Sequence, residues 1–311
     1  FLDQPGGPAL EGATVASLPD YALAALSGGE VKAEATIAAA YGLLDLETME
    51  WNRTVIEKLG LAGFRFPELV SYREAVYLLE RGGRRFRCFP PIGDHQAALL
   101  GSRLEPGEFS LNLSTGSQVS ALGSTLCPGD HQTRPFFDGE YLNVYSHIPA
   151  GRALNILVGL VTEMRRLEGG EIEDPWGLIA EAVETTQSSD LEVDLSFFKS
   201  RETEAGWIGN IREANLTVGH LFRAAFESMA DRYHRFAARL PEAEDVERLV
   251  FSGGLAQKVP VLREIIMERF GLEARLCQSE EDTMLGLLVG ALSASGRAGS
   301  IREAMESVKK C

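Results

Sequence analysis

Hydrophobic residues recur at helical spacing in the first third of the chain. Residues 18–26 and 33–43 each form such an apolar stretch, and a turn over residues 44–52 leads into a third that ends before Gly60. A glycine directly after a stretch of this kind commonly marks the end of a helix. The pattern therefore predicts three short helices, followed by a fourth that begins at Asp94 after a proline-containing loop.

The pattern changes after residue 105, where polar and hydrophobic positions begin to alternate. Residues 109–113 and 118–122 have the period of two that a half-buried strand requires, and the small residues at 114–117 between them predict a hairpin. A third strand is predicted at 141–148. The later apolar segments predict helices at 152–167, 217–240, 259–270 and 281–295, and strands at 248–251 and 274–277. Three strands followed by alternating helices and strands indicate a mixed α/β lobe.

The composition is that of a soluble globular protein, and 311 residues allow about two domains of roughly 150 residues each. The formal net charge is −15 and the basic clusters are short, so we expect no nucleic-acid partner. No uninterrupted apolar run reaches the roughly 18 residues of a membrane helix, so we expect no membrane partner either. The four cysteines have no paired spacing, which predicts free thiols in a reducing cytoplasm.

A carboxylate stands where the fourth predicted helix begins. Aspartate is a preferred N-cap residue, so the spacing alone explains Asp94 as a helix cap. The alternative is that its carboxylate faces a cleft and accepts a proton from a hydroxyl group, as a general base does. The two roles are compatible, and the pattern by itself does not choose between them.

Two further segments have the composition of ligand-binding turns. Residues 114–117 (Ser-Thr-Gly-Ser) would expose amides and hydroxyls that suit a phosphate, although ordinary β-turns share this composition. At residues 251–256 a buried strand runs into two glycines and then a helix, which lets a flat ligand approach the backbone or simply supplies a turn with positive φ. The phosphate-loop pattern GxxxxGK[ST] and the dinucleotide pattern GxGxxG are absent, which disfavours P-loop and Rossmann enzymes.

Taken together and in this order, these segments resemble those of the FGGY carbohydrate kinases. The resemblance covers a pattern of the first lobe, the segment with the catalytic aspartate, the second phosphate motif, two segments that line the adenosine site, and the closing Glu-x-Thr-x-Leu-Gly helix. The corresponding residues are 42–61, 93–101, 114–117, 150–155, 252–255 and 281–286.

The resemblance implies an α/β fold of the actin-like ATPase (ribonuclease H-like) type, in which sugar and ATP meet in a cleft between two lobes. We place the hinge near residues 103–106. Residues 1–103 would then be the remainder of the N-terminal lobe with the catalytic aspartate, and residues 104–311 the C-terminal, nucleotide-binding lobe. Family members begin with an Asp-Gly-Thr-type hairpin that this sequence lacks, so we expect the front of the first lobe to be missing from this chain and the first lobe to be truncated.

The resemblance also implies roles for individual residues. Asp94 would be the base that activates the sugar hydroxyl. His95, Gln96 and Gln118 are candidates for sugar contact, and a local structural hydrogen bond is an equal alternative for each. The residues implied at ATP are Ser114, Thr115, Gly116, Gly151, Asn155, Gly253, Gly254 and Lys258. ATP and Mg²⁺ are the implied cofactors, and the magnesium ligands are unknown because the usual carboxylates belong to the front of the first lobe.

Within the family, residues 111–118, 135–142 and 215–220 are most similar to the sedoheptulokinases, which implies sedoheptulose as the phosphate acceptor. Glycerol, xylulose or ribulose as acceptor stays open. So does a sugar- or nucleotide-binding regulator without catalysis, although the presence of Asp94 argues against it. The motifs of acetate-type and hexokinase-type kinases are absent. A homodimer is compatible with the sequence, which does not set the oligomeric state.

Overall fold

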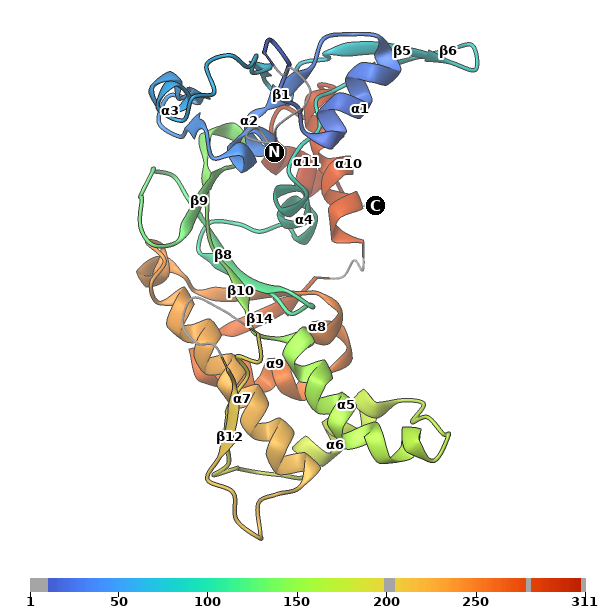
Figure 1. The fold of residues 1–311 in the computed structure, drawn as a ribbon, viewed down its shortest axis with the longest axis vertical. Coiled ribbons are helices and arrows are strands. Elements are labelled where there is room, and N and C mark those ends of the chain that lie inside the picture. The colour runs from blue at the N-terminus through green and yellow to red at the C-terminus, as the bar shows by residue number, and fades with distance from the viewer. Residues whose placement is uncertain (1–10, 199–204, 278–280, 309–311) are drawn as a thin grey trace.

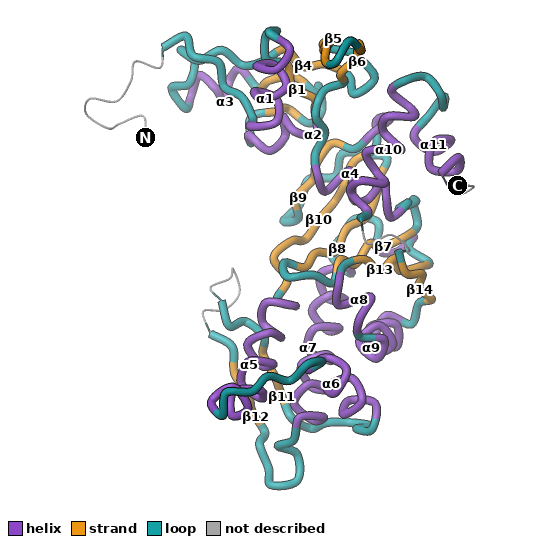
Figure 2. Tube along the Cα trace, turned by 90° about the vertical axis from the view of Figure 1, so that its right-hand side faces the viewer, coloured by secondary structure: helices purple, strands orange, loops and turns teal. Residues whose placement is uncertain are grey.

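A central sheet with helices on both faces organises the molecule (Figure 1). The computed structural model describes residues 11–198, 205–277 and 281–308. The N-terminal segment lies at one end of an elongated arrangement, next to the last two helices of the chain, as two perpendicular views show (Figures 1 and 2).

The central sheet has six strands in the order β14-β13-β7-β8-β10-β9. Strand β13 is parallel to both β7 and β14, and the other neighbours are antiparallel. The bounds are β7 (Glu108–Asn112), β8 (Ser117–Gly123), β9 (Gln132–Pro135), β10 (Tyr141–Ile148), β13 (Arg248–Ser252) and β14 (Glu273–Leu276). All five strands that the sequence predicted in this region are confirmed to within one residue at each end, and β9 is an addition.

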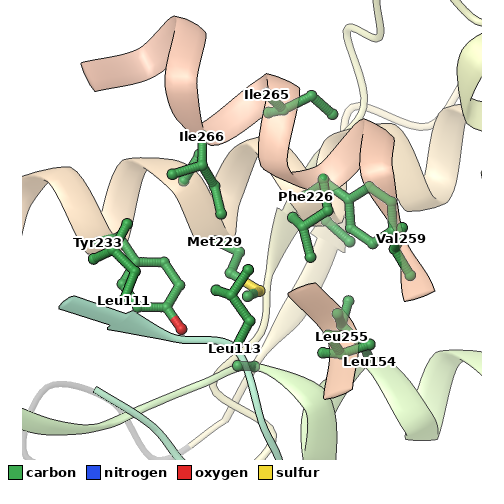
Figure 3. Close-up of a cluster of buried hydrophobic side chains, with 14 of the residues drawn as sticks. Leu111, Leu113, Leu154, Phe226, Met229, Tyr233, Leu255, Val259, Ile265 and Ile266 are labelled. Carbon is green, nitrogen blue, oxygen red and sulfur yellow. The ribbon is translucent and has the colours of Figure 1, made fainter. Parts of the chain in front are cut away.

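Five helices cover one face of the sheet. They are α5 (Gly151–Leu167), α6 (Pro175–Glu184), α7 (Val218–Ala237), α8 (Gly254–Lys258) and α9 (Pro260–Phe270). Helix α7 carries most of this contact: Phe226, Met229 and Tyr233 are buried in one cluster with Leu111 and Leu113 (Figure 3). The Tyr233 hydroxyl donates to the carbonyl oxygen of Asn112 at 3.0 Å, which ties α7 to the end of β7.

Three helices cover the opposite face: α4 (Asp94–Ser102), α10 (Asp282–Ala294) and α11 (Ile301–Val308). Their apolar side chains form a second cluster with Leu122, Leu142 and Val250 of the sheet. Helices α4 and α10 cross at glycines. A Cβ atom built on Gly286 would lie 1.7 Å from the carbonyl oxygen of Ala97, so only glycine permits this approach.

The N-terminal segment is built from short elements. They are α1 (Leu18–Ser27), β1 (Lys32–Glu34), α2 (Ala35–Ala38), a 3₁₀ turn (Ala39–Tyr41), β2 (Leu44–Asp45), β3 (Glu50–Trp51), α3 (Arg53–Lys58), β4 (Glu68–Val70), β5 (Tyr77–Arg81) and β6 (Arg84–Cys88). The single helix predicted at 33–43 is wrong. Residues 32–34 pair in parallel with β4, and the Glu34 carboxylate accepts the Thr36 N–H at 2.8 Å, so the helix starts only at Ala35.

The remaining elements are small. Strands β11 (Glu192–Asp194) and β12 (Trp207–Gly209) form a separate antiparallel pair beside α7, and two further 3₁₀ turns cover Phe137–Gly139 and Ala243–Asp245. No described helix has the length and apolar character needed to cross a membrane. The predicted domain boundary after residue 103 stays a prediction; α4, which precedes it, packs against α10 and the central sheet.

Candidate active site

The carboxylate of Asp94 lies exposed at the start of α4. Gly93, and not Asp94, is the N-cap residue, because its backbone is not helical (ψ of 134°) and its carbonyl oxygen accepts the N–H of Ala97 at 2.9 Å. Asp94 is the first helical residue, and its Oδ1 accepts the N–H of His95 at 2.7 Å. The positive end of the helix dipole favours a negative charge at this position. The N-cap explanation of Asp94 is therefore wrong, and its exposed carboxylate is available to a ligand.

His95 places its ring over the sheet, between two polar side chains. Its Nε2 lies 3.4 Å from the Ser120 hydroxyl of β8, and its Nδ1 lies 3.4 Å from a guanidinium nitrogen of Arg134 on β9. Burial and the positive charge of Arg134 lower the pKa of His95 to about 4, and the negative charge of Asp94 only partly opposes them. The imidazole is therefore neutral near pH 7.

Arg134 is a cation next to Asp94 that the sequence reasoning did not identify. One guanidinium nitrogen donates to Gln132 Oε1 at 2.6 Å. Burial lowers the pKa of Arg134, and the nearby charge of Asp94 opposes this shift. Ser120 and Arg134 lie on the same face of the sheet as α4, since Ser120 pairs with Val144 and Arg134 with Leu142, which both face that side. Neither residue belongs to a motif, and Arg134 lies on the strand that was not predicted.

Gln96 and Gln118, the other two candidates for sugar contact, differ in accessibility. The Gln96 side chain is only 2% exposed, and its amide nitrogen donates to the Pro135 carbonyl at 3.1 Å. For Gln96 the structure thus has the local hydrogen bond that was the alternative to a sugar contact. Gln118 is half-buried at the start of β8, on the same face of the sheet as Ser120, and it remains a candidate.

The phosphate hairpin, which we define as residues 113–116 between β7 and β8, meets the start of α5. The Gly151 N–H donates to the Ser114 carbonyl at 3.1 Å, and the Arg152 N–H to the Thr115 carbonyl at 3.4 Å. A Cβ atom on Gly151 would lie 2.8 Å from the Ser114 oxygen, so a larger residue would push the hairpin away. The sequence motifs at 114–117 and 150–155 are therefore in direct contact.

The glycine pair after β13 also meets the hairpin. Gly253 has a φ of +90°, and a Cβ atom on it would lie 2.7 Å from the Leu113 carbonyl oxygen, so this position requires glycine. Gly116 and Gly254, by contrast, have nothing within 4 Å of a Cβ position, which leaves open space above both backbones. The Asn155 side chain is exposed on α5, which begins at Gly151, and the Lys258 side chain is exposed on α8, which begins at Gly254.

Strand β8 connects the phosphate hairpin with the candidate residues around Asp94 and His95. Strand β8 leaves the phosphate hairpin at Ser117 and reaches the His95 ring at Ser120. Four residues from Gly116 to Ser120 span about 13 Å of extended chain. Strand β8 therefore leads from the hairpin to the side chain that contacts His95, the residue after Asp94.

The described residues contain no cluster of three or more side chains of the His, Cys, Asp and Glu types that could hold a metal. Magnesium in nucleotide sites is held by phosphate oxygens, waters and one or two carboxylates. Asp94 is an exposed carboxylate in this region, but a single carboxylate does not define a site, so we assign no magnesium ligand.

Several solved structures share the fold of this chain. No protein-family model matches the chain. The ligand-bound xylulose kinase from Lactobacillus acidophilus superimposes with a TM-score of 0.78 at 13% identity, over 93% of this chain and 60% of that one. The Plasmodium falciparum glycerol kinase with ADP gives 0.78 at 18% identity with the same coverage, and the Lactobacillus acidophilus gluconate kinase gives 0.75 at 13%. The chain has the fold of the two-lobed sugar kinases, as the sequence predicted.

A curated relative extends the similarity to the sequence. The chain is 22% identical to a sedoheptulokinase of Mus musculus over 253 residues, which is 75% of this chain and 52% of that protein. The resemblance to the FGGY carbohydrate kinases is thus confirmed. The chain spans about half the length of this relative and about 60% of the kinases of known structure.

Proposed function

We propose that the chain is the part of an ATP-dependent carbohydrate kinase that binds the nucleotide and contains the general base. The observation that carries the proposal is the convergence of three sequence motifs on one hairpin, from which strand β8 leads to Ser120, the contact of the His95 ring that follows the exposed Asp94. ATP, when bound, supplies the phosphoryl group. Phosphoryl transfer asks the protein mainly for positioning and for stabilisation of charge, which open amides and nearby cations provide.

In this mechanism Asp94 Oδ atoms accept the proton of the attacking sugar hydroxyl. The carboxylate is exposed, and its bond to the His95 N–H fixes its orientation at the start of α4. The neutral His95 ring accepts or donates one hydrogen bond without adding a charge next to the base. The amides of the phosphate hairpin bind the phosphate end of the nucleotide, and the open backbone at Gly254 borders its adenosine end.

Sedoheptulose is the acceptor we propose, because the curated relative is a sedoheptulokinase and three segments of the chain resemble that subfamily. The solved relatives act on other acceptors according to their names, among them xylulose, glycerol and gluconate. A coupled kinase assay over a panel of ketoses, polyols and sugar acids tests this choice. A clear preference for xylulose, ribulose or glycerol would refute sedoheptulose and leave the kinase class intact.

The decisive variant is Asp94→Asn, measured in the complete enzyme. Loss of a general base lowers the rate by roughly 10²- to 10⁴-fold, while nucleotide affinity should stay nearly unchanged because Asp94 lies away from the hairpin. Glu47→Gln is a matched control, since it removes an exposed carboxylate from a turn of the N-terminal segment. A variant that retains most of its rate would return Asp94 to a structural role and favour a binding protein without catalysis.

A further inference from the structure

A cavity of about 770 Å³ opens beside the phosphate hairpin. Thr115 and Gly116 line it on one side, and the second half of β10 lines it on the other. Strand β9 pairs with β10 only as far as Val144, so in the described part of the chain no strand covers this edge of residues 145–148. The cavity is large enough for a small organic ligand.

The charged lining of this cavity is mostly positive, although the chain has a net charge of −15. Three arginines, at positions 152, 232 and 239, face one carboxylate, that of Asp130. A second cavity of about 650 Å³ beside α7 shows the opposite balance, with four carboxylates and three arginines. Excess positive charge in a recess of an acidic protein attracts anions locally.

Carboxylates of the described residues pair with two of the three arginines. Arg239 forms an ion pair with Asp130, and Arg232 forms one with Asp194 at 2.7 Å. For Arg152, no carboxylate of the described residues lies within the 4.0 Å that defines an ion pair. Its charge is therefore the one that a ligand in the cavity would neutralise.

The geometry of Arg152 suits a phosphate group. Its N–H donates to the Thr115 carbonyl at 3.4 Å, which fixes its backbone to the phosphate hairpin. Its guanidinium carbon lies 3.8 Å from the centre of the Phe198 ring, so the planar group rests on an aromatic wall of the cavity. A stacked guanidinium keeps its N–H edge free, and that edge matches two oxygens of a phosphate.

We propose that this cavity is a phosphate site, in which Arg152 binds the phosphate group of an organic phosphate. The proposal rests on the proposed function in one respect: the terminal phosphate of the nucleotide is one source of that group, since the hairpin is shared. A phosphorylated sugar, held by the polar side chains on the far wall, is the other source. Arg152 would contact the phosphate group of either ligand in the same way, and binding experiments distinguish the two ligands.

The test is calorimetric binding of ADP with magnesium, adenosine and ribose 5-phosphate to four proteins: the unmodified chain, Arg152→Gln, Arg152→Lys and Arg165→Gln. Arg165 is a matched control, because it is an exposed arginine near the other end of the same helix. Loss of a charge-assisted phosphate contact should weaken binding roughly 10- to 100-fold, with partial rescue by lysine. Arg165→Gln should bind like the unmodified chain.

A loss for ADP but not for adenosine assigns the site to the nucleotide phosphates. A loss for ribose 5-phosphate alone assigns it to a separate phosphate ester. Unchanged affinity of Arg152→Gln for both phosphates, or an equal loss in Arg165→Gln, overturns the proposal. An unmodified chain that binds ribose 5-phosphate but neither ADP nor adenosine would refute the kinase function and leave the phosphate site standing. A chain that binds neither phosphate refutes both.

Discussion

The crossing of α4 and α10 holds the candidate base in place, and Gly286→Ala should disturb it. A Cβ atom at Gly286 would lie 1.7 Å from the Ala97 carbonyl oxygen, whereas real Cβ atoms keep at least 3.0 Å from such an atom. The two helices must therefore separate by about 1.3 Å. The obstacle is backbone, so a side-chain rotation cannot relieve it. Asp94 lies less than one helical turn before Ala97 and would move with α4.

Two opposing effects set the change in the free energy of unfolding. Overpacking of a close-packed interface costs about 1–3 kcal/mol, and a clash with a carbonyl oxygen belongs at the upper end. Replacing a helical glycine by alanine contributes about 1 kcal/mol in the other direction. The variant should therefore lose about 2 kcal/mol of stability. In the complete enzyme a displacement of about 1 Å at the base should lower the rate by roughly 100-fold.

Gly290→Ala is the matched control on the same helix. A Cβ atom there would meet only the Ile92 side chain at 3.7 Å, which is an ordinary contact, so this variant should be stabilised by up to about 1 kcal/mol. Urea unfolding of both variants measures the difference directly. Equal stability of the two variants, or an unchanged rate in Gly286→Ala, would refute the idea that this crossing positions Asp94.

Two other predictions concern the His95 ring and the glycine pair. Because the pKa of His95 is lowered to about 4 in the folded protein from an ordinary 6.5, the unfolded state takes up the proton first, and up to about 3 kcal/mol of stability should be lost as the pH falls from 6.5 to 4. The free energy of unfolding, measured against pH, should show that His95→Gln lacks this loss. Parallel curves for the unmodified chain and the variant would contradict the prediction. Gly254→Val should leave stability unchanged, because its Cβ position is open, yet weaken nucleotide binding in a titration. Gly253→Val should instead be destabilised by its φ of +90° and the nearby Leu113 carbonyl, and equal stability loss in both variants would contradict the assignment.

Most of the central sheet could be predicted from the sequence because polar and hydrophobic residues alternate strongly along its strands. Strand β10 was located to the residue, and the ends of the hairpin strands to within one. The N-terminal segment was harder, since its strands have three residues or fewer until β5 and have no measurable period. Residues 32–38 illustrate the limit: alanines favour a helix, but pairing with β4 makes a strand of the first three.

The candidate site was predictable where a backbone requirement fixes a residue, and not where contacts are distant in sequence. Gly151 was identified through the family resemblance, and Gly253 as part of a strand-to-helix turn with positive φ; the structure adds that each allows the hairpin to approach closely. Arg134 lies 40 residues from Asp94, on a strand without a pattern, and only the folded sheet places its charge beside the base. Arg152 was inside a recognised segment, but its importance appears only when the ion pairs of the neighbouring arginines are known.

The segment 135–142, on which the sedoheptulokinase resemblance partly rests, has a structural role in this chain. Phe136 and Phe137 are buried in the core on the α4 side of the sheet. The Asp138 carboxylate accepts hydrogen bonds from the Tyr72 hydroxyl at 2.7 Å, from Arg73 at 3.0 Å and from the first amide of α11 at 3.3 Å. It thus joins the N-terminal segment, the sheet and the last helix. These residues contact one another and do not line an open site. Their similarity to the sedoheptulokinases therefore reflects packing between parts of the fold. We propose that the acceptor is recognised at other positions, at Asp94, Gln118 and Arg134, and the substrate panel applied to variants of these residues tests this.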